Sequence, residues 1–329
     1  MQEQKMTRPN RKAFSSIFLK TKSVTEAARI NEQSKTLINE LTHWSSQFPS
    51  ILQTRIPPLS LILTATYPAN NLDALLLTGM TNLWIFAVDD LFDSATLSTK
   101  SLSELTEKFN LIITEAPSPT LLNDELGQIL GNIRKDVAKF SLFEHLESNW
   151  CNAFKNMLNG MVKEAIWREK FQLFNELPDL DGYLENGLNT VGGPPHIWTT
   201  LITTNDFSLL KVQKALDEMV LTASACIRLA NDWQSYGKEI KEGSFNSLTI
   251  WENHQRCNLS GEFALEEAKK CLIAQIEEEL ERLKRLKIDI NTETGLPETV
   301  IVNIAEFVSE FYMQHDFHTM TRKTCLPFE

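Results

Sequence analysis

The chain has 329 residues, of which 42% are hydrophobic and 23% charged, the balance of a globular protein with a large core. Its formal net charge of −11 argues against nucleic acid as a partner, because a phosphate backbone requires a basic protein face. The five cysteines show no CxxC spacing, so we expect reduced thiols in a cytoplasmic protein.

Helical periodicity runs through most of the chain, and no convincing alternating strand pattern interrupts it. The basic first 20 residues are expected to form a flexible tail, followed by one helical domain at residues 21–329. The expected fold class is therefore all-α, a single-domain helical bundle. In chain order, helices are expected at 25–44, 72–92, 102–115, 123–168 with a break near 139–142, 179–190, 196–203, 208–240, 265–287 and 298–317.

The segment Leu72–Val88 comes nearest to a membrane span. Asp73 and several polar residues interrupt it, and a cluster of acids follows at once. A membrane span needs a run of about 18 or more strongly apolar residues without such interruptions. We therefore expect a buried helix here and no stable membrane insertion.

The acidic cluster Asp89–Asp93, DDLFD, stands at the end of this apolar helix. Burying a carboxylate is costly unless a positive charge pairs with it, so three acids in five positions need an explanation. Each helical residue advances by about 100° around the axis, which puts the acids on the same stripe as Asn82, Ile85 and Phe86. A pocket wall with a charged rim above it would have this pattern.

A second polar cluster follows much later, in the sequence NDWQSYGKE. Asn231, Ser235 and Glu239 are spaced four residues apart and form one oxygen-bearing line on a helix. Arg228 and Lys238 fall on the same face. The second cluster therefore combines oxygen ligands with two cationic side chains.

Both clusters offer hard oxygen ligands, the type that suits Mg²⁺, an ion that uses few protein carboxylates and bridges to substrate phosphates. Either cluster alone is better explained as a solvated helix end or a polar helix face than as a metal site. Two such clusters on two apolar helices of an all-α chain are much more specific for a metal and phosphate site.

The two motifs resemble the paired aspartate-rich and NSE motifs of class I terpene synthases of the microbial single-α-domain type. The stretch 228–248, RLANDWQSYGKEIKEGSFNSL, is most similar to diterpene cyclases, bacterial ones above all. The resemblance covers nearly the whole chain. It implies a helical bundle around a central apolar cavity, and three Mg²⁺ ions as cofactors.

By this resemblance the residues of both motifs are catalytic, and Asp90 belongs to the aspartate-rich motif beside its metal ligands. The metal ligands implied are Asp89 and Asp93 on one side of the pocket mouth and Asn231, Ser235 and Glu239 on the other. The diphosphate would be bound by Arg228 and Lys238 and, near the C-terminus, by Tyr312 and Arg322.

The sequence VGGPP at 191–195 breaks a helix, and Gly192 and Gly193 resemble the helix break that helps to initiate ionisation in this family. The expected cavity wall comprises Asn82, Ile85, Phe86, Trp198, Ser224 and Ile227. The polar loop 241–245 and the C-terminal tail are expected to close over the site.

One position departs from the family pattern. Bacterial members usually carry a diphosphate-sensing arginine where this chain has Glu185, and no arginine occurs between Arg168 and Arg228. Either Arg228 takes over this role or the trigger differs.

The expected function is Mg²⁺-dependent ionisation of a linear isoprenyl diphosphate, followed by carbocation cyclisation to a cyclic terpene and release of diphosphate. Geranylgeranyl diphosphate is favoured as substrate, with farnesyl diphosphate as the alternative. Two other functions remain open, an isoprenyl diphosphate synthase and a non-catalytic helical binding protein. A prenyltransferase requires a second aspartate-rich motif where this chain has Asn231, Ser235 and Glu239. Homodimer formation is left open.

Overall fold

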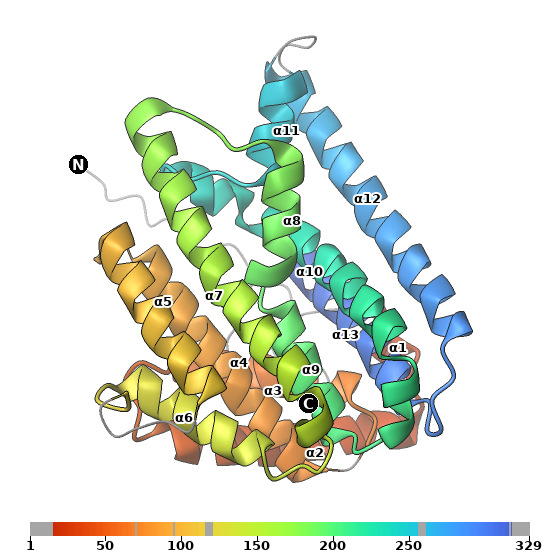
Figure 1. Ribbon diagram of the computed structural model, residues 1–329. Helices are drawn as coiled ribbons and strands as arrows, with labels where there is room; N and C mark the ends of the chain where they lie inside the picture. Colours follow the sequence, from red (N-terminus) through yellow and green to blue (C-terminus); the bar gives the residue numbers. More distant parts are fainter. Residues whose placement is uncertain are drawn as a thin grey trace, which may run out of the picture.

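The computed structural model describes residues 16–69, 71–94, 96–115, 121–255, 261–315 and 317. All regular elements within these ranges are helices, which confirms the all-α fold class (Figure 1). The α-helices are α1 (Ile17–Lys20), α2 (Val24–Ser45), α3 (Ile56–Thr66), α4 (Leu72–Asp93), α5 (Thr99–Thr114), α6 (Glu125–Val137), α7 (Phe143–Phe174), α8 (Leu180–Thr190), α9 (Gly193–Thr203), α10 (Gln213–Lys241), α11 (Ser247–Gln255), α12 (Gly261–Asp289) and α13 (Leu296–Gln314). Two short 3-10 helices, η1 (Gln53–Arg55) and η2 (Phe207–Lys211), precede α3 and α10.

Helix α4 runs through the core and carries the DDLFD motif at its C-terminal end. Its N-cap is Asn71, whose side chain accepts a hydrogen bond from the backbone N–H of Ala74 at 3.1 Å. It packs against α2, α3, α6, α7 and α9. Among the described helices, α4 alone is long and apolar enough to cross a membrane, but 72% of its most apolar window is buried by its neighbours. That is the pattern of a core helix.

Helix α10 is the second central helix and carries the NDWQSYGKE motif. It packs against α8, α9, α12 and α13, while α7 contacts α4, α8 and α9 and so connects the two halves of the bundle. In Figure 1, α12 forms the outer edge of the molecule beside α10, and α5 and α6 lie on the opposite side. This arrangement places the C-terminal halves of α4 and α10 around one pocket.

Two helix starts that contain prolines were predicted wrongly from the sequence. Helix α3 was not expected, because Pro57 and Pro58 read as helix breakers, yet they occupy its first turn. Helix α9 begins at Gly193, three residues earlier than expected, and contains Pro194 and Pro195 in its first turn. Proline is tolerated in the first turn, where the backbone N–H has no helical partner in any case.

Other boundaries also differ from those expected. The segment before α10 is the 3-10 helix η2, so the long helix begins at Gln213, and α11 was not predicted. Residues 1–15 of the expected tail lie outside the described residues. The end of that tail is packed and not loose, because Phe18 is buried against Phe307 of α13 and the carboxylate of Glu310 accepts the backbone N–H of Phe18 at 3.1 Å.

Candidate active site

A pocket of about 490 Å³ opens between α4, α7, α8, α10 and α13. All six residues of the two predicted motifs line it: Asp89, Asp90, Asp93, Asn231, Ser235 and Glu239. Two helices whose motifs are about 140 residues apart in sequence therefore present their polar ends to one space. The roles of these six residues as metal ligands stay predictions, but the fold itself brings the six residues together at one pocket.

Two of the three acids of the DDLFD motif are held by arginines from other elements. Arg55, at the end of η1, pairs with Asp90 at 2.7 Å, and its guanidinium also donates to the carbonyl of Phe86 at 3.1 Å. Arg168 on α7 pairs with Asp93 at 2.7 Å. The acidic motif is therefore partly neutralised before any ligand arrives.

The third acid, Asp89, is in a strongly negative environment. Burial, together with the charges of Asp93, Asp90 and Glu164, raises the pKa of Asp89 to about 8. A cation bound next to this carboxylate would favour its charged form. The arrangement is that of a group which becomes fully ionised when a positive charge occupies the pocket.

Glu239 provides a similar signal on the opposite wall. Burial and then the charge of Asp232 raise the pKa of Glu239 to about 8, and a more distant contribution comes from Asp93 across the pocket. Its Oε2 atom is buried and has no hydrogen-bond partner within the described residues. A buried carboxylate oxygen without a partner is costly, and a cation at this point would satisfy it.

The donor set fits Mg²⁺ in chemistry. The six predicted motif residues that line the pocket carry hard oxygen donors, and the amide nitrogen of Asn231 is the one other polar atom among their side chains. Among the described residues, no three His, Cys, Asp or Glu side chains stand close enough together to hold a metal alone. Mg²⁺ does not require such a cage, because it keeps several waters and binds through one or two carboxylates and substrate phosphates.

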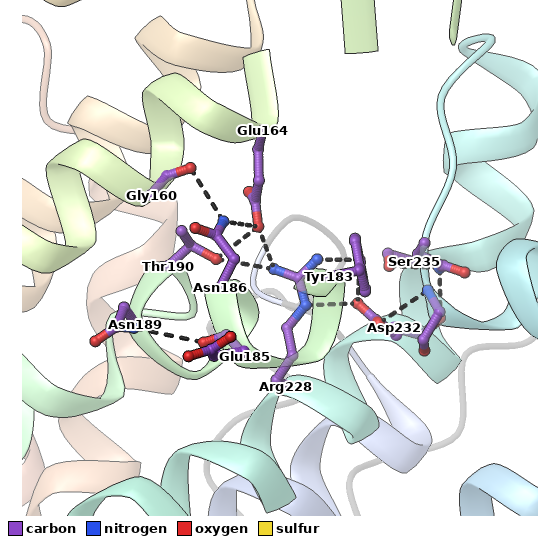
Figure 2. A network of polar contacts seen from close by, with 12 residues as sticks. Gly160, Glu164, Tyr183, Glu185, Asn186, Asn189, Thr190, Arg228, Asp232 and Ser235 are labelled. Atoms are coloured by element: carbon purple, nitrogen blue, oxygen red, sulfur yellow. Dashed lines mark hydrogen bonds and ion pairs between the residues drawn. The ribbon is translucent and has the colours of Figure 1, made fainter. Parts of the chain in front are cut away.

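Arg228 lines the same pocket, but its guanidinium is already engaged (Figure 2). It pairs with Asp232 at 2.9 Å and with Glu164 at 3.3 Å, and it also donates to the hydroxyls of Tyr183 and of Thr190. Asp232 is fully buried and accepts a further hydrogen bond from Tyr183 at 3.2 Å. The structure therefore places Arg228 at the pocket, as the sequence predicted. Its positive charge, however, is already neutralised by two carboxylates.

Glu164 is the centre of this network. Besides Arg228, its Oε1 atom accepts from the hydroxyl of Thr190 at 2.7 Å and from the amide of Asn186 at 3.4 Å. These partners come from α8 and α10, so that Glu164 links α7 to both helices (Figure 2). The carbonyl of Glu185 accepts from Asn189 at 3.5 Å, and among the described residues no hydrogen bond or ion pair joins this pair to the network of Glu164.

The helix break between α8 and α9 reaches the pocket through Thr190 and Val191. Gly192 has φ +75°, a backbone conformation that L side chains rarely adopt, and an added Cβ would lie 2.9 Å from a methyl carbon of Ile85. A Cβ on Gly193 would lie 2.5 Å from the hydroxyl of Ser224. The two glycines thus allow α9 to start close against α4 and α10.

The remaining predicted residues divide into two groups. Lys238 and Tyr312 line the pocket, as do Ile85 and Phe86 of the expected cavity wall, while Arg322 lies outside the described residues. The other four wall residues do not line this pocket and are buried in the packed core: Asn82, Trp198, Ser224 and Ile227. Asn82, Ser224 and Ile227 are on the helices that carry pocket residues but precede those residues along the helix, and a helical wheel does not resolve position along the axis. Trp198 is on α9, which contributes no residue to the pocket lining.

Aromatic rings form the apolar end of the pocket. Phe317 packs on Phe86 with ring centroids 4.6 Å apart and on Phe311 at 5.0 Å, and Tyr312 is 5.9 Å from Phe317. Phe317 is buried and, with Phe86 and Tyr312, belongs to the lining. Sequence analysis missed it because no local pattern marks a residue after the last helix as part of a pocket.

The segment expected to be a mobile loop after Glu239 is anchored. Phe245 is buried and packs on Phe171 and Tyr183, with ring centroids 5.2 and 6.0 Å away. The fully buried Asn246 donates from its amide to the carbonyl of Asp232 at 2.8 Å. The expectation of a freely moving loop up to residue 245 is therefore wrong at its C-terminal end.

Arg55, Glu164 and Arg168 are pocket residues that sequence analysis also missed. Their functional contacts connect residues far apart in sequence, which periodicity does not reveal. The spacing of Glu164 and Arg168, one helical turn apart on α7, was the available signal, because it puts both on one face.

Comparison with known proteins identifies the family. The model of terpene synthase family 2, C-terminal metal binding, matches residues 81–282, which include both motifs. The chain belongs to the terpene synthase family. Its recognition from the two motifs is thereby confirmed.

Curated terpene synthases from plants resemble this chain in sequence. It is 27% identical over 173 residues to ent-beyerene synthase of Oryza sativa subsp. japonica, covering 51% of this chain and 19% of that protein. It is 28% identical over 213 residues to ent-kaurene synthase of Marrubium vulgare, covering 60% of this chain and 26% of that protein. The chain thus matches about a fifth to a quarter of the length of these relatives.

Solved terpene synthases share the fold. Abietadiene synthase from Abies grandis superposes with a TM-score of 0.66 at 21% identity, over 92% of this chain and 40% of that chain. Linalool/nerolidol synthase from Streptomyces clavuligerus, in complex with 2-fluorogeranyl diphosphate, superposes with a TM-score of 0.64 at 16% identity, over 87% of this chain and 92% of that chain.

Proposed function

We propose that this terpene synthase is a class I cyclase that ionises an isoprenyl diphosphate with the help of Mg²⁺ and cyclises the resulting carbocation. The observation that carries the proposal is the convergence of the DDLFD and NDWQSYGKE motifs on one pocket. The solved synthase bound to 2-fluorogeranyl diphosphate supports an isoprenyl diphosphate as the class of substrate.

The charge of the pocket supports a requirement for cations. Six carboxylate side chains and four cationic side chains line it, which leaves a formal charge of −2. Three of the four cations are also paired with carboxylates: Arg55, Arg168 and Arg228. A multiply charged diphosphate would be repelled unless divalent cations entered with it.

The residues of this chain would divide the work between the two ends of the pocket. Bound Mg²⁺ would supply Lewis acidity to the departing diphosphate oxygen. Lys238 and, once its partners yield, Arg228 would hold the diphosphate at the charged mouth. The rings of Phe86, Tyr312 and Phe317 would face the hydrocarbon, where an aromatic face stabilises a cation by about 0.5–2 kcal/mol.

For the substrate we propose geranylgeranyl diphosphate, with farnesyl diphosphate as the alternative. The curated relatives are named for ent-beyerene and ent-kaurene, which are diterpenes. The proposed product is a cyclic diterpene, released together with inorganic diphosphate.

The test is incubation of the purified protein with the linear C10, C15 and C20 allylic diphosphates. Each incubation is run with Mg²⁺ and with EDTA, followed by mass spectrometry of the extract and assay of free diphosphate. We expect terpene and equimolar diphosphate from a C20 substrate with Mg²⁺ and neither with EDTA.

Two outcomes would contradict the proposal. Consumption of an allylic diphosphate only when isopentenyl diphosphate is added, with a longer diphosphate as product, would identify a prenyltransferase. Binding of the diphosphates without any turnover under all these conditions would identify a binding protein.

A further inference from the structure

Three arginines line the pocket, and they differ in how firmly they are held. Arg55 is only 3% exposed and is fixed by Asp90 and a backbone carbonyl. Arg228 is 12% exposed and is held by two carboxylates. Arg168 is 21% exposed and has one carboxylate partner within the described residues, Asp93. Arg168 is therefore the most exposed of the three pocket arginines.

The partner of Arg168 is itself accessible from the pocket. The side chain of Asp93 is 58% exposed, and Asp93 belongs to the motif that the family match and the donor chemistry mark for metal binding. A carboxylate that ligates a divalent cation has less charge left for a guanidinium. Arrival of the cation at Asp93 would thus weaken the ion pair of Arg168.

The released guanidinium would lie at the pocket mouth. Arg168 lines the pocket together with Lys238 and Glu239 of the opposite wall. Its second contact is a long hydrogen bond of 3.5 Å to the carbonyl of Phe92, which would restrain it little. A guanidinium is well suited to binding phosphate oxygens, because its donors form a planar fork.

We propose that Arg168 is a diphosphate-binding residue whose guanidinium remains paired with Asp93 until a divalent cation binds that carboxylate. This inference rests on the proposed function. It assigns to α7 the cationic contact that Glu185 on α8 does not supply. Metal binding and diphosphate binding would then be coupled through one exchange of partners.

The first test separates this role from a purely structural ion pair. Inorganic diphosphate binding is measured by calorimetry with Mg²⁺ present, and Mn²⁺ binding alone is measured by its electron paramagnetic resonance signal. For Arg168→Ala we expect diphosphate affinity to fall about 10–100-fold, the loss typical of a charged hydrogen bond, while Mn²⁺ affinity rises. Arg168→Lys should restore part of the diphosphate affinity.

A matched control is Arg134→Ala, which removes another arginine paired with a carboxylate, Glu147 at 2.6 Å, away from this pocket. It should change neither affinity. A fall of both affinities in Arg168→Ala, or no change in either, would overturn the inference.

The second test releases Arg168 without a metal. In EDTA, Asp93→Asn should increase affinity for inorganic diphosphate about tenfold or more, by freeing the guanidinium. The double variant Asp93→Asn with Arg168→Ala should lose this gain. If the gain persists in the double variant, it comes only from removal of a negative charge and the exchange is refuted.

The two proposals fail in different ways. If the wild-type protein binds no inorganic diphosphate with Mg²⁺, the proposed function fails and this inference falls with it. If the wild-type protein binds diphosphate and Arg168→Ala binds it equally well, only the role of Arg168 is refuted.

Discussion

At the scale of single residues, Asp89 is the acid on which the site depends most directly. Within the described residues it has no ion pair, and the negative charges around it disfavour its ionised form. We expect Asp89→Ala to abolish turnover and to leave the melting temperature nearly unchanged, because removing a repelled carboxylate costs little packing. Product formation by mass spectrometry and thermal melting by circular dichroism measure the two effects.

The control for this prediction is Asp73→Ala, which removes an exposed acid from the first turn of the same helix. It should retain activity. Hydrocarbon production by Asp89→Ala at close to the wild-type rate would contradict the assignment of Asp89 to the metal site.

His196 is a buried residue of α9 that does not line the pocket. Its Nδ1 atom is 2.8 Å from Oδ1 of Asn82, whose amide donates to the carbonyl of Thr78 at 2.7 Å, so Oδ1 accepts and Nδ1 carries the proton. The Nε2 atom of His196 is buried and has no hydrogen-bond partner within the described residues. Burial lowers the pKa of His196 from 6.5 to about 4.

Because the unfolded chain binds a proton at its ordinary pKa and the folded chain does not, the free energy of unfolding falls as the pH drops from 6.5 toward 4. The contribution of His196 between pH 7 and pH 5 should be about 2 kcal/mol. The variant His196→Asn places an amide donor near the position of the Nδ1 atom, and its side chain does not titrate. Urea unfolding at both pH values should show a smaller pH dependence in this variant, and an equal dependence would refute the prediction.

At the scale of elements, the break between α8 and α9 depends on Gly192. We expect Gly192→Ala to lower the free energy of unfolding by about 1–3 kcal/mol, because alanine is strained at positive φ and its Cβ would crowd Ile85. The matched change is Gly237→Ala in α10, where an added Cβ meets nothing within 4 Å. It should raise the stability by up to about 1 kcal/mol. Denaturant titration of both variants provides the comparison, and equal shifts would show that backbone conformation at residue 192 is unimportant.

Local pattern was sufficient for the elements that carry the motifs. The apolar periodicity placed α4 and the C-terminal end of α10 to within one residue, while the start of α10 was predicted five residues too early. Their polar faces predicted one shared pocket. Helix α3 was missed because two prolines outweighed its apolar run. The arginines that pair with the acids were missed because such pairs join α4 to η1 and α7, and no short-range pattern encodes those contacts.

At the scale of the whole molecule, the pocket exists only where five helices meet. A ligand that requires this arrangement binds the folded chain alone and stabilises it by mass action, by about 2.7 kcal/mol at a concentration one hundred times its Kd. We expect Mg²⁺ and inorganic diphosphate together to raise the melting temperature by several degrees. Diphosphate alone should have little effect, because the pocket has a formal charge of −2 and repels an anion. Differential scanning fluorimetry checks this, and an equal shift from diphosphate in EDTA would contradict it.

The anchoring of the segment after α10 has a mechanical consequence. The side-chain amide of Asn246 donates to the carbonyl of Asp232, and the backbone N–H of Ser244 donates to the carbonyl of Glu239 at 2.8 Å. Both ends of this segment are therefore attached to α10, the helix that carries Asn231 and Glu239. We therefore expect any closing movement of the segment to involve α10 itself. Metal binding and the exclusion of solvent would then occur in one conformational change.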